Sequence, residues 1–125
     1  MEQQKEPIVI PYKIEMTREM LIRFQVIFMA FINGVYLTPQ DINTLTLLGL
    51  KGEQPLLPYC KELVGRKLFT SIQSSRNTIS KLHKKGFLIK KGTSKKRISL
   101  LPTICTIHDN TVLINIQCLY DTSEN

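Results

Sequence analysis

Apolar residues recur at intervals of three and four along the first half of the chain, which is the period of an amphipathic helix. The longest such stretch spans residues 18–32, after an extended apolar arm over residues 7–14 that contains two prolines. Thr17 precedes this stretch as an N-cap, and Asn33 and Gly34 follow it as a stop signal. The pattern therefore predicts a helix over residues 18–32.

The predicted helix is apolar around most of its circumference. One stripe consists of Met20, Leu21, Phe24, Ile27, Phe28 and Phe31. A second stripe consists of Ile22, Val26 and Met29. A small domain covers one face of such a helix, which leaves the second stripe either as an oligomer interface or as a surface covered by the C-terminal part of the chain.

Two shorter helices are predicted next. Thr38 supplies a capping hydroxyl, Pro39 suits the first helical position, and the Asp41 carboxylate meets the positive end of the helix dipole. A helix should therefore run from residue 39 to about residue 50. Glycines and prolines then interrupt the pattern, and a second short helix is expected over residues 59–67.

A fourth helix and a hairpin follow a linker over residues 68–73. Ile79 and Leu82 at helical spacing, with Gly86 as a C-terminal stop, predict a helix over residues 74–85. Alternation then begins at residue 87, turns at residues 92–94 and returns over residues 96–101.

Positive charge is concentrated in this last helix and hairpin. No carboxylate occurs in the 46 residues between Glu62 and Asp109, and residues 66–97 hold 11 of the 17 Lys and Arg residues. Since the formal net charge is +7, the rest of the chain carries −4. A block without acids attracts a polyanion, and nucleic acid is the commonest one because each neutralised phosphate releases counterions.

The basic segment resembles winged helix-turn-helix proteins, in particular MarR-like regulators and the replication initiators of phages and plasmids. Residues 75–82, Ser-Arg-Asn-Thr-Ile-Ser-Lys-Leu, are similar to a recognition helix, and residues 84–89 to the step into the wing. Residues 37–45 are similar to the first element of the tri-helical core. The resemblance implies an α+β fold, a winged helix-turn-helix with an extra N-terminal helix and a C-terminal β-hairpin, that binds double-stranded DNA.

Candidate nucleic-acid contacts lie on the fourth helix and on the hairpin. The residues in this helix and directly before it that suit the major groove are Gln73, Ser74, Ser75, Arg76, Asn77, Thr78 and Lys81. On the wing, Lys95, Lys96 and Arg97 are expected to reach the phosphate backbone or a minor groove.

These residues also have plain structural interpretations. Ser74 or Ser75 would serve equally as the N-cap of the helix. Lys84 and Lys85 suit the negative end of the helix dipole, and a lysine-rich hairpin can be an edge protected against aggregation.

The winged-helix pattern ends at Pro102. Residues 103–108 and 111–119 alternate like strands around Asp109-Asn110, and a two-residue turn would pair Ile107 with Val112, Cys105 with Ile114 and Thr103 with Ile116. We expect an N-terminal arm over residues 1–16, a winged-helix domain over 17–102, and a hairpin with a tail over 103–125. MarR-like proteins continue after the wing into dimerising helices, so a hairpin at this position differs from their pattern.

No pattern indicates catalysis, a cofactor or a metal site. The sequence lacks a Gly-rich phosphate loop, a nucleophile elbow, a His-Glu pair at metal spacing and a Cys-x-x-Cys motif. His83 lies among lysines, and His108 with Cys105 and Cys118 would give only an incomplete metal site. We expect a non-enzymatic protein without a small-molecule substrate.

Two functions fit these expectations. The first is a DNA-binding regulator or replication accessory, forming a homodimer or larger assembly, that reads the major groove with helix 74–85 and the backbone with wing 90–97. The second is a structural component of a phage virion or nucleoprotein particle, whose winged helix contacts protein or nucleic acid nonspecifically. No apolar run reaches the length of a membrane span, and three widely spaced cysteines suit a reducing compartment. The expected location is the cytoplasm of a bacterial or phage-infected cell, or else a virion.

Overall fold

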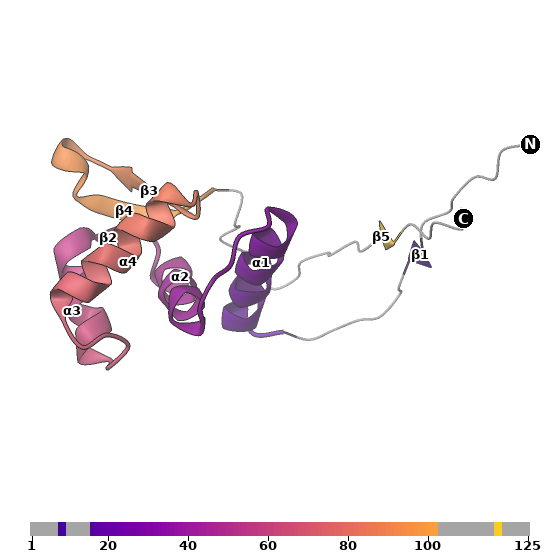
Figure 1. Ribbon diagram of the computed structural model, residues 1–125, viewed down its shortest axis with the longest axis horizontal. Coiled ribbons are helices and arrows are strands. Elements are labelled where there is room, and N and C mark those ends of the chain that lie inside the picture. Colours follow the sequence, from indigo (N-terminus) through magenta and orange to yellow (C-terminus); the bar gives the residue numbers. More distant parts are fainter. Residues whose placement is uncertain (1–7, 10–15, 103–116, 119–125) are drawn as a thin grey trace, which may run out of the picture. The chain divides into compact units, whose positions relative to one another are not determined.

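The computed structural model describes residues 8–9, 16–102 and 117–118. Residues 16–102 lie in one compact unit, in which four helices pack with a three-stranded antiparallel sheet (Figure 1). This arrangement confirms the predicted α+β class and the winged helix-turn-helix with an extra N-terminal helix. None of the helices in the described residues is long and apolar enough to cross a membrane.

A second compact unit contains two short strands from the ends of the chain. β1 (Ile8–Val9) and β5 (Gln117–Cys118) pair antiparallel, with Ile8 opposite Cys118. The pairing joins the predicted arm to the predicted tail. The hairpin expected around Asp109-Asn110 lies outside the described residues.

Helices α1 (Arg18–Ile32) and α2 (Pro39–Lys51) begin at the predicted threonine caps. Thr17 Oγ1 accepts a hydrogen bond from the Met20 N–H at 3.1 Å. At the start of α2, Thr38 Oγ1 accepts from the Asp41 N–H at 3.1 Å, and the Asp41 carboxylate accepts from the Thr38 N–H at 3.0 Å. This reciprocal capping box satisfies backbone donors that a helix start leaves open.

Helix α3 (Leu56–Gly65) follows directly on the short strand β2 (Gln54–Pro55) and begins three residues before its predicted start. Tyr59 of α3 is buried, and its hydroxyl donates to the Thr44 carbonyl of α2 at 2.6 Å. Burial raises the pKa of Tyr59 far above its usual value. The neutral phenol therefore fixes α3 against α2.

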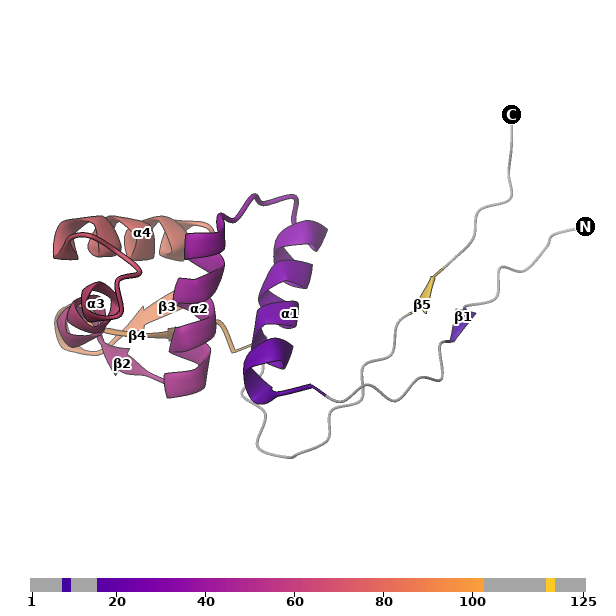
Figure 2. The same cartoon turned by 90° about the horizontal axis from the view of Figure 1, so that it is seen from below.

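Helix α4 (Ile72–Lys84) begins two residues earlier than predicted, because Ser71 rather than Ser74 or Ser75 supplies the N-cap. Ser71 Oγ accepts the Ser74 N–H at 3.1 Å. The predicted stop at Gly86 is correct, since this glycine has a φ of +86°, which favours glycine over other residues. Figure 2 shows α2 between α1 and α4.

The predicted wing is present as β3 (Leu88–Lys91) and β4 (Arg97–Leu100), with Leu88 opposite Leu100. The short 3₁₀ helix η1 (Thr93–Lys95) forms its tip. β2 pairs with the other edge of β4, so the strand order is β2-β4-β3. This third strand was not predicted, because two residues are too few to show an alternating pattern.

All four helices and the sheet contribute to the core. Its largest fully buried side chains are Tyr59, Phe87, Ile22, Leu45, Leu48, Leu63, Ile79, Leu82, Leu88, Ile98 and Val26. Gly49 in α2 marks a close approach of three elements. A Cβ atom added there would lie 2.8 Å from Cγ2 of Ile22 in α1 and 2.6 Å from Cδ1 of Leu100 in β4.

The burial of Ile22 and Val26 corrects the predicted oligomer interface. Both side chains have 0% exposed surface and belong to the core, and Met29 packs partly buried against the same core. The prediction that Ile22 and Val26 face another chain is therefore wrong. In the other apolar stripe of α1, Leu21 is also buried, while Met20, Ile27, Phe28 and Phe31 are exposed to solvent.

Replacing Gly49 with alanine should lower the free energy of unfolding by about 1–3 kcal/mol, because the added methyl group would overlap the buried Ile22 side chain. Urea unfolding followed by circular dichroism measures the change. Gly65→Ala is the control, since nothing lies within 4 Å of a Cβ added at that helical position. Equal stability of the two variants would contradict tight packing of α1 and β4 on α2.

Candidate nucleic-acid interface

Helix α4 turns one face to the core and the opposite face to solvent. Ile79 and Leu82 are buried in the core. Gln73, Arg76 and Asn77 are exposed, at the spacing of three and four that brings side chains together on one side of a helix. The predicted base-reading cluster therefore lies on the open surface of the domain.

The polar groups of this cluster remain available for a ligand. Gln73 Nε2 donates a hydrogen bond to Asn77 Oδ1 at 2.9 Å, which orients the two amides. The Asn77 amino group and the Gln73 carbonyl take no part in this bond. Arg76 makes no hydrogen bond or ion pair with any other described residue. Its guanidinium group keeps five N–H donors in a planar fork.

Two predicted contact residues are instead used inside the helix. Ser75 is fully buried, and its Oγ donates to the Ile72 carbonyl at 2.7 Å, so the prediction that it contacts nucleic acid is wrong. Ser74 donates its N–H to Ser71 Oγ and its hydroxyl to the Ser71 carbonyl at 2.9 Å, so it belongs to the helix cap. Thr78 is half-buried.

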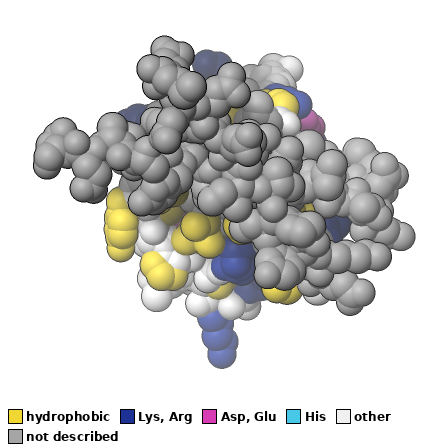
Figure 3. Space-filling model, turned by 90° about the vertical axis from the view of Figure 1, so that its right-hand side faces the viewer, with side chains coloured by type: hydrophobic (Ala, Val, Ile, Leu, Met, Phe, Trp, Pro, Cys, Tyr) yellow, Lys and Arg dark blue, Asp and Glu magenta, His cyan; other side chains and the backbone are white. Residues whose placement is uncertain are grey.

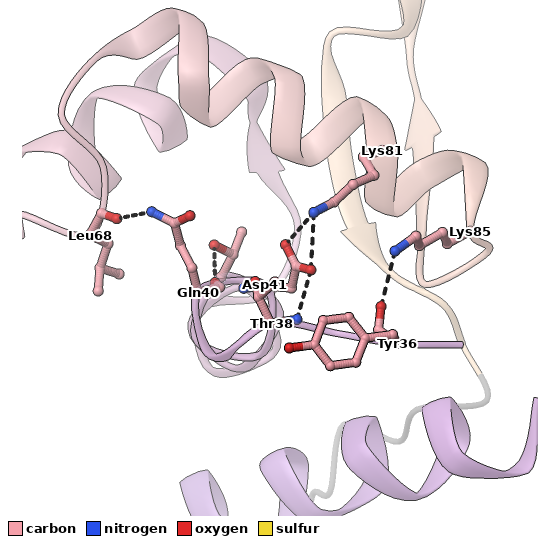
Figure 4. Close-up of polar contacts among 8 residues, drawn as sticks. Tyr36, Thr38, Gln40, Asp41, Leu68, Lys81 and Lys85 are labelled. Carbon is pink, nitrogen blue, oxygen red and sulfur yellow. Dashed lines mark hydrogen bonds and ion pairs between the residues drawn. The ribbon is translucent and has the colours of Figure 1, made fainter. Parts of the chain in front are cut away.

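Lys81 forms an ion pair with the carboxylate that caps α2 (Figure 4). Its Nζ lies 2.9 Å from Oδ1 and 3.1 Å from Oδ2 of Asp41, whose side chain is only 1% exposed. Burial alone would raise the pKa of Asp41, but hydrogen bonds from Lys81 and Thr38 outweigh it and hold this pKa below its usual value. The charge of Lys81 is thus paired with Asp41, although its side chain is 42% exposed.

Two further side chains bind the start of α2 to α4 and to the loop before it (Figure 4). Gln40 Nε2 donates to the Leu68 carbonyl, and Lys85 Nζ donates to the Tyr36 carbonyl at 3.0 Å. These contacts join segments that are 28 and 49 residues apart in the chain. Together with Lys81, they set the position of α4 on α2.

The end of the wing next to its tip is fixed by Glu53, which precedes β2. Arg97 Nε lies 2.6 Å from its Oε2, and Lys91 Nζ lies 3.6 Å from its Oε1. The Arg97 hydrogen bond is the main cause that lowers the pKa of Glu53. Arg97 was predicted to contact phosphate, and in this structure its charge is paired with Glu53. The side chains of Lys95 and Lys96 are exposed at the tip and have no partner among the described residues.

Carboxylates from the first half of the chain neutralise part of the basic block. Of its 11 cations, Arg66, Lys81, Lys91 and Arg97 pair with Glu62, Asp41 or Glu53. The seven cations without a carboxylate partner among the described residues are Lys67, Arg76, Lys84, Lys85, Lys90, Lys95 and Lys96. Residues 16–102 contain 15 Lys and Arg against 4 Asp and Glu, so the domain stays strongly basic.

A metal site is not evident in the part of the chain that the structure describes. No group of three His, Cys, Asp or Glu side chains within it lies close enough to hold an ion. Cys60 is a buried core residue, and His83 is exposed on α4. The incomplete site weighed for His108, Cys105 and Cys118 involves residues outside the described side chains.

Comparison with solved structures yields a protein of the same fold. It is a zinc uptake regulator complexed with zinc and DNA, with a TM-score of 0.57 and 19% sequence identity to this chain. The match covers 79% of this chain and 62% of the regulator, so this chain corresponds to less than two thirds of that protein's length. No protein-family model and no curated protein sequence matches.

The ion pair between Asp41 and Lys81 should contribute measurably to stability. Lys81→Met would leave a buried carboxylate without its cation, and we expect a loss of about 1–3 kcal/mol at pH 7, below the full cost of breaking a buried pair because the lysine is partly exposed. Lys84→Met, on the same helix but unpaired, should change stability little. Chemical unfolding of both variants tests this expectation.

The same pair predicts a pH dependence. A carboxyl group with a lowered pKa in the folded state stabilises the fold above its unfolded pKa of about 3.9, and this contribution is lost as the pH falls through the folded pKa. The stability difference between wild type and Lys81→Met should therefore shrink below about pH 4. A difference that stays constant from pH 7 to pH 3 would contradict the assignment.

Proposed function

We propose that this protein is a transcriptional regulator that binds double-stranded DNA with α4 in the major groove. The observation that carries the proposal is the exposed cluster of Gln73, Arg76 and Asn77, in which Arg76 has no partner among the described residues, on a helix that also carries cations without a carboxylate partner. The fold shared with a regulator that was solved in complex with DNA supports this assignment. Neither argument rests on metal binding.

The cluster has the chemistry of direct base readout. The planar fork of Arg76 matches the O6 and N7 acceptors of guanine, and an amide such as that of Asn77 matches N6 and N7 of adenine. The hydrogen bond from Gln73 holds the Asn77 carbonyl, so the Asn77 amino group is directed away from Gln73. A preset orientation reduces the side-chain entropy that binding would otherwise cost.

The remaining cations suit phosphate contacts on either side of the groove. Lys95 and Lys96 lie at the wing tip, and Lys84 lies at the C-terminal end of α4. Contacts with DNA phosphates position a recognition helix on the duplex but do not distinguish one base sequence from another. We assign Lys95 and Lys96 to the backbone flanking the base pairs that α4 would read.

Base readout predicts a loss of discrimination on mutation. Replacing Arg76 and Asn77 with alanine should weaken binding to a selected cognate duplex by about 1–3 kcal/mol per residue, and change affinity for random duplexes much less. Fluorescence anisotropy with duplexes enriched from a random library measures both. Arg66→Ala is a matched control, because Arg66 is already paired with Glu62 on α3.

Equal losses on all duplexes, or no enriched motif, would favour the other hypothesis. In that case the winged helix would bind nucleic acid nonspecifically within a virion or nucleoprotein particle. A replication accessory would give the same motif as a regulator, so transcription from a promoter that carries the enriched site separates those two functions.

The wing makes a separate prediction. Lys95→Ala with Lys96→Ala should weaken binding to all sequences alike, and the slope of log affinity against log salt should fall by about 0.9 for each phosphate that the wing no longer neutralises. Lys61→Ala, an exposed lysine on α3 outside the proposed surface, is the control. An unchanged salt slope in the wing variant would remove the wing from the interface.

A further inference from the structure

The outer face of α1 carries exposed apolar side chains in a continuous row. The exposed fractions are 50% for Met20, 46% for Ile27, 48% for Phe28 and 81% for Phe31. Phe24 stacks on Phe28 with ring centroids 5.8 Å apart. Figure 3 shows several hydrophobic side chains exposed on this side of the molecule. We call Met20, Phe24, Ile27, Phe28 and Phe31 the α1 seam.

The spacing of the α1 seam indicates that its partner is a helix. Met20, Phe24, Ile27 and Phe31 follow one another at intervals of four, three and four. This is the 3.5-residue repeat that keeps an apolar row facing a second helix along its whole length. The core-facing stripe of α1 already packs against α2, so the seam is a second contact surface of the same helix.

We propose that the α1 seam binds the α1 seam of a second copy of this chain, in an antiparallel pair related by a two-fold axis. In this register Met20 faces Phe31 of the second copy, and Phe24 faces Ile27 of the second copy. Each layer thus combines a smaller side chain with a larger one. A two-fold interface must be self-complementary, and this order of residues satisfies that condition.

The exposed area suits a stable dimer. Ile32 and Tyr36, which are 62% and 76% exposed, extend the apolar surface beyond the seam. With these two, the exposed side chains offer on the order of 600–800 Å² on each copy. A standard protein interface buries about 800 Å² per partner. The surface is also larger than the apolar patches that most monomeric proteins leave open.

The charge distribution also favours a second copy at this face. Residues 24–34 contain no Lys, Arg, Asp or Glu, so the pairing brings no charges together along the centre of the seam. Figure 2 places α1 and α4 on opposite sides of α2, so the basic surfaces of both copies stay free. Two strongly basic domains repel each other at a distance, and salt screens this repulsion.

Light scattering after size-exclusion chromatography, on the full chain without DNA, tests the dimer. We expect twice the chain mass of 14.4 kDa and a dimer that tightens as salt rises. Phe31→Glu should weaken dimerisation about tenfold or more, because it would place a charge in the seam. Since Phe31 is 81% exposed, the fold should persist, and circular dichroism checks this.

Leu57→Glu is the matched control, because Leu57 is a 46% exposed apolar residue on α3, outside the seam. A monomeric wild type at roughly 100 µM, which is well above the dissociation constants of stable dimers, would overturn the proposal. A Phe31→Glu variant whose dissociation constant, measured by dilution, equals that of the wild type would also overturn it, as would a Leu57→Glu variant weakened as much as Phe31→Glu. The measurement uses no DNA, so its failure would leave the DNA-binding proposal intact.

Discussion

The buried carboxylate of Asp41 is the charged link between α2 and α4, and it constrains how α4 sits on the rest of the domain. It caps the first turn of α2 and accepts two hydrogen bonds from Lys81 of α4. Removing a charge from water is costly, so such a group is tolerated only where its hydrogen bonds are nearly all satisfied. The Lys81 ammonium group must approach the Asp41 carboxylate from the side on which its two oxygens are open. This geometry restricts the angle at which α4 crosses α2.

The placement of the acids explains which cations remain free. Asp41, Glu53 and Glu62 each lie in or beside α2 and α3, and each pairs with at least one partly exposed cation. None of the three reaches the exposed side of α4 or the wing tip. Positive potential is therefore focused on one surface, although four cations of the basic block are neutralised.

The sequence was most informative where structure depends on neighbours in the chain. The threonine caps, Gly86 and the wing hairpin are local features, and they were predicted correctly. The two faces of α1 were ranked wrongly, because both are apolar and the packing on α2, which includes the close approach of Ile22 to Gly49, decides which one is buried. The pairing of Asp41 with Lys81 joins residues 40 positions apart, and it left no local pattern. For the same reason Arg97 was assigned to phosphate before its neighbour Glu53 was known.

The ion pairs of Glu53 with Arg97 and Lys91 also affect how fast the wing could bind a ligand. A hairpin that is held at the strand ends next to its tip keeps most of its backbone dihedral angles set before any encounter, so few torsions need to be frozen at the moment of contact. Only the side chains of Lys95 and Lys96 remain to be ordered. The wing would therefore act as a rigid arm with two flexible side chains at its tip, whose search for a phosphate is limited by side-chain rotation rather than by loop closure.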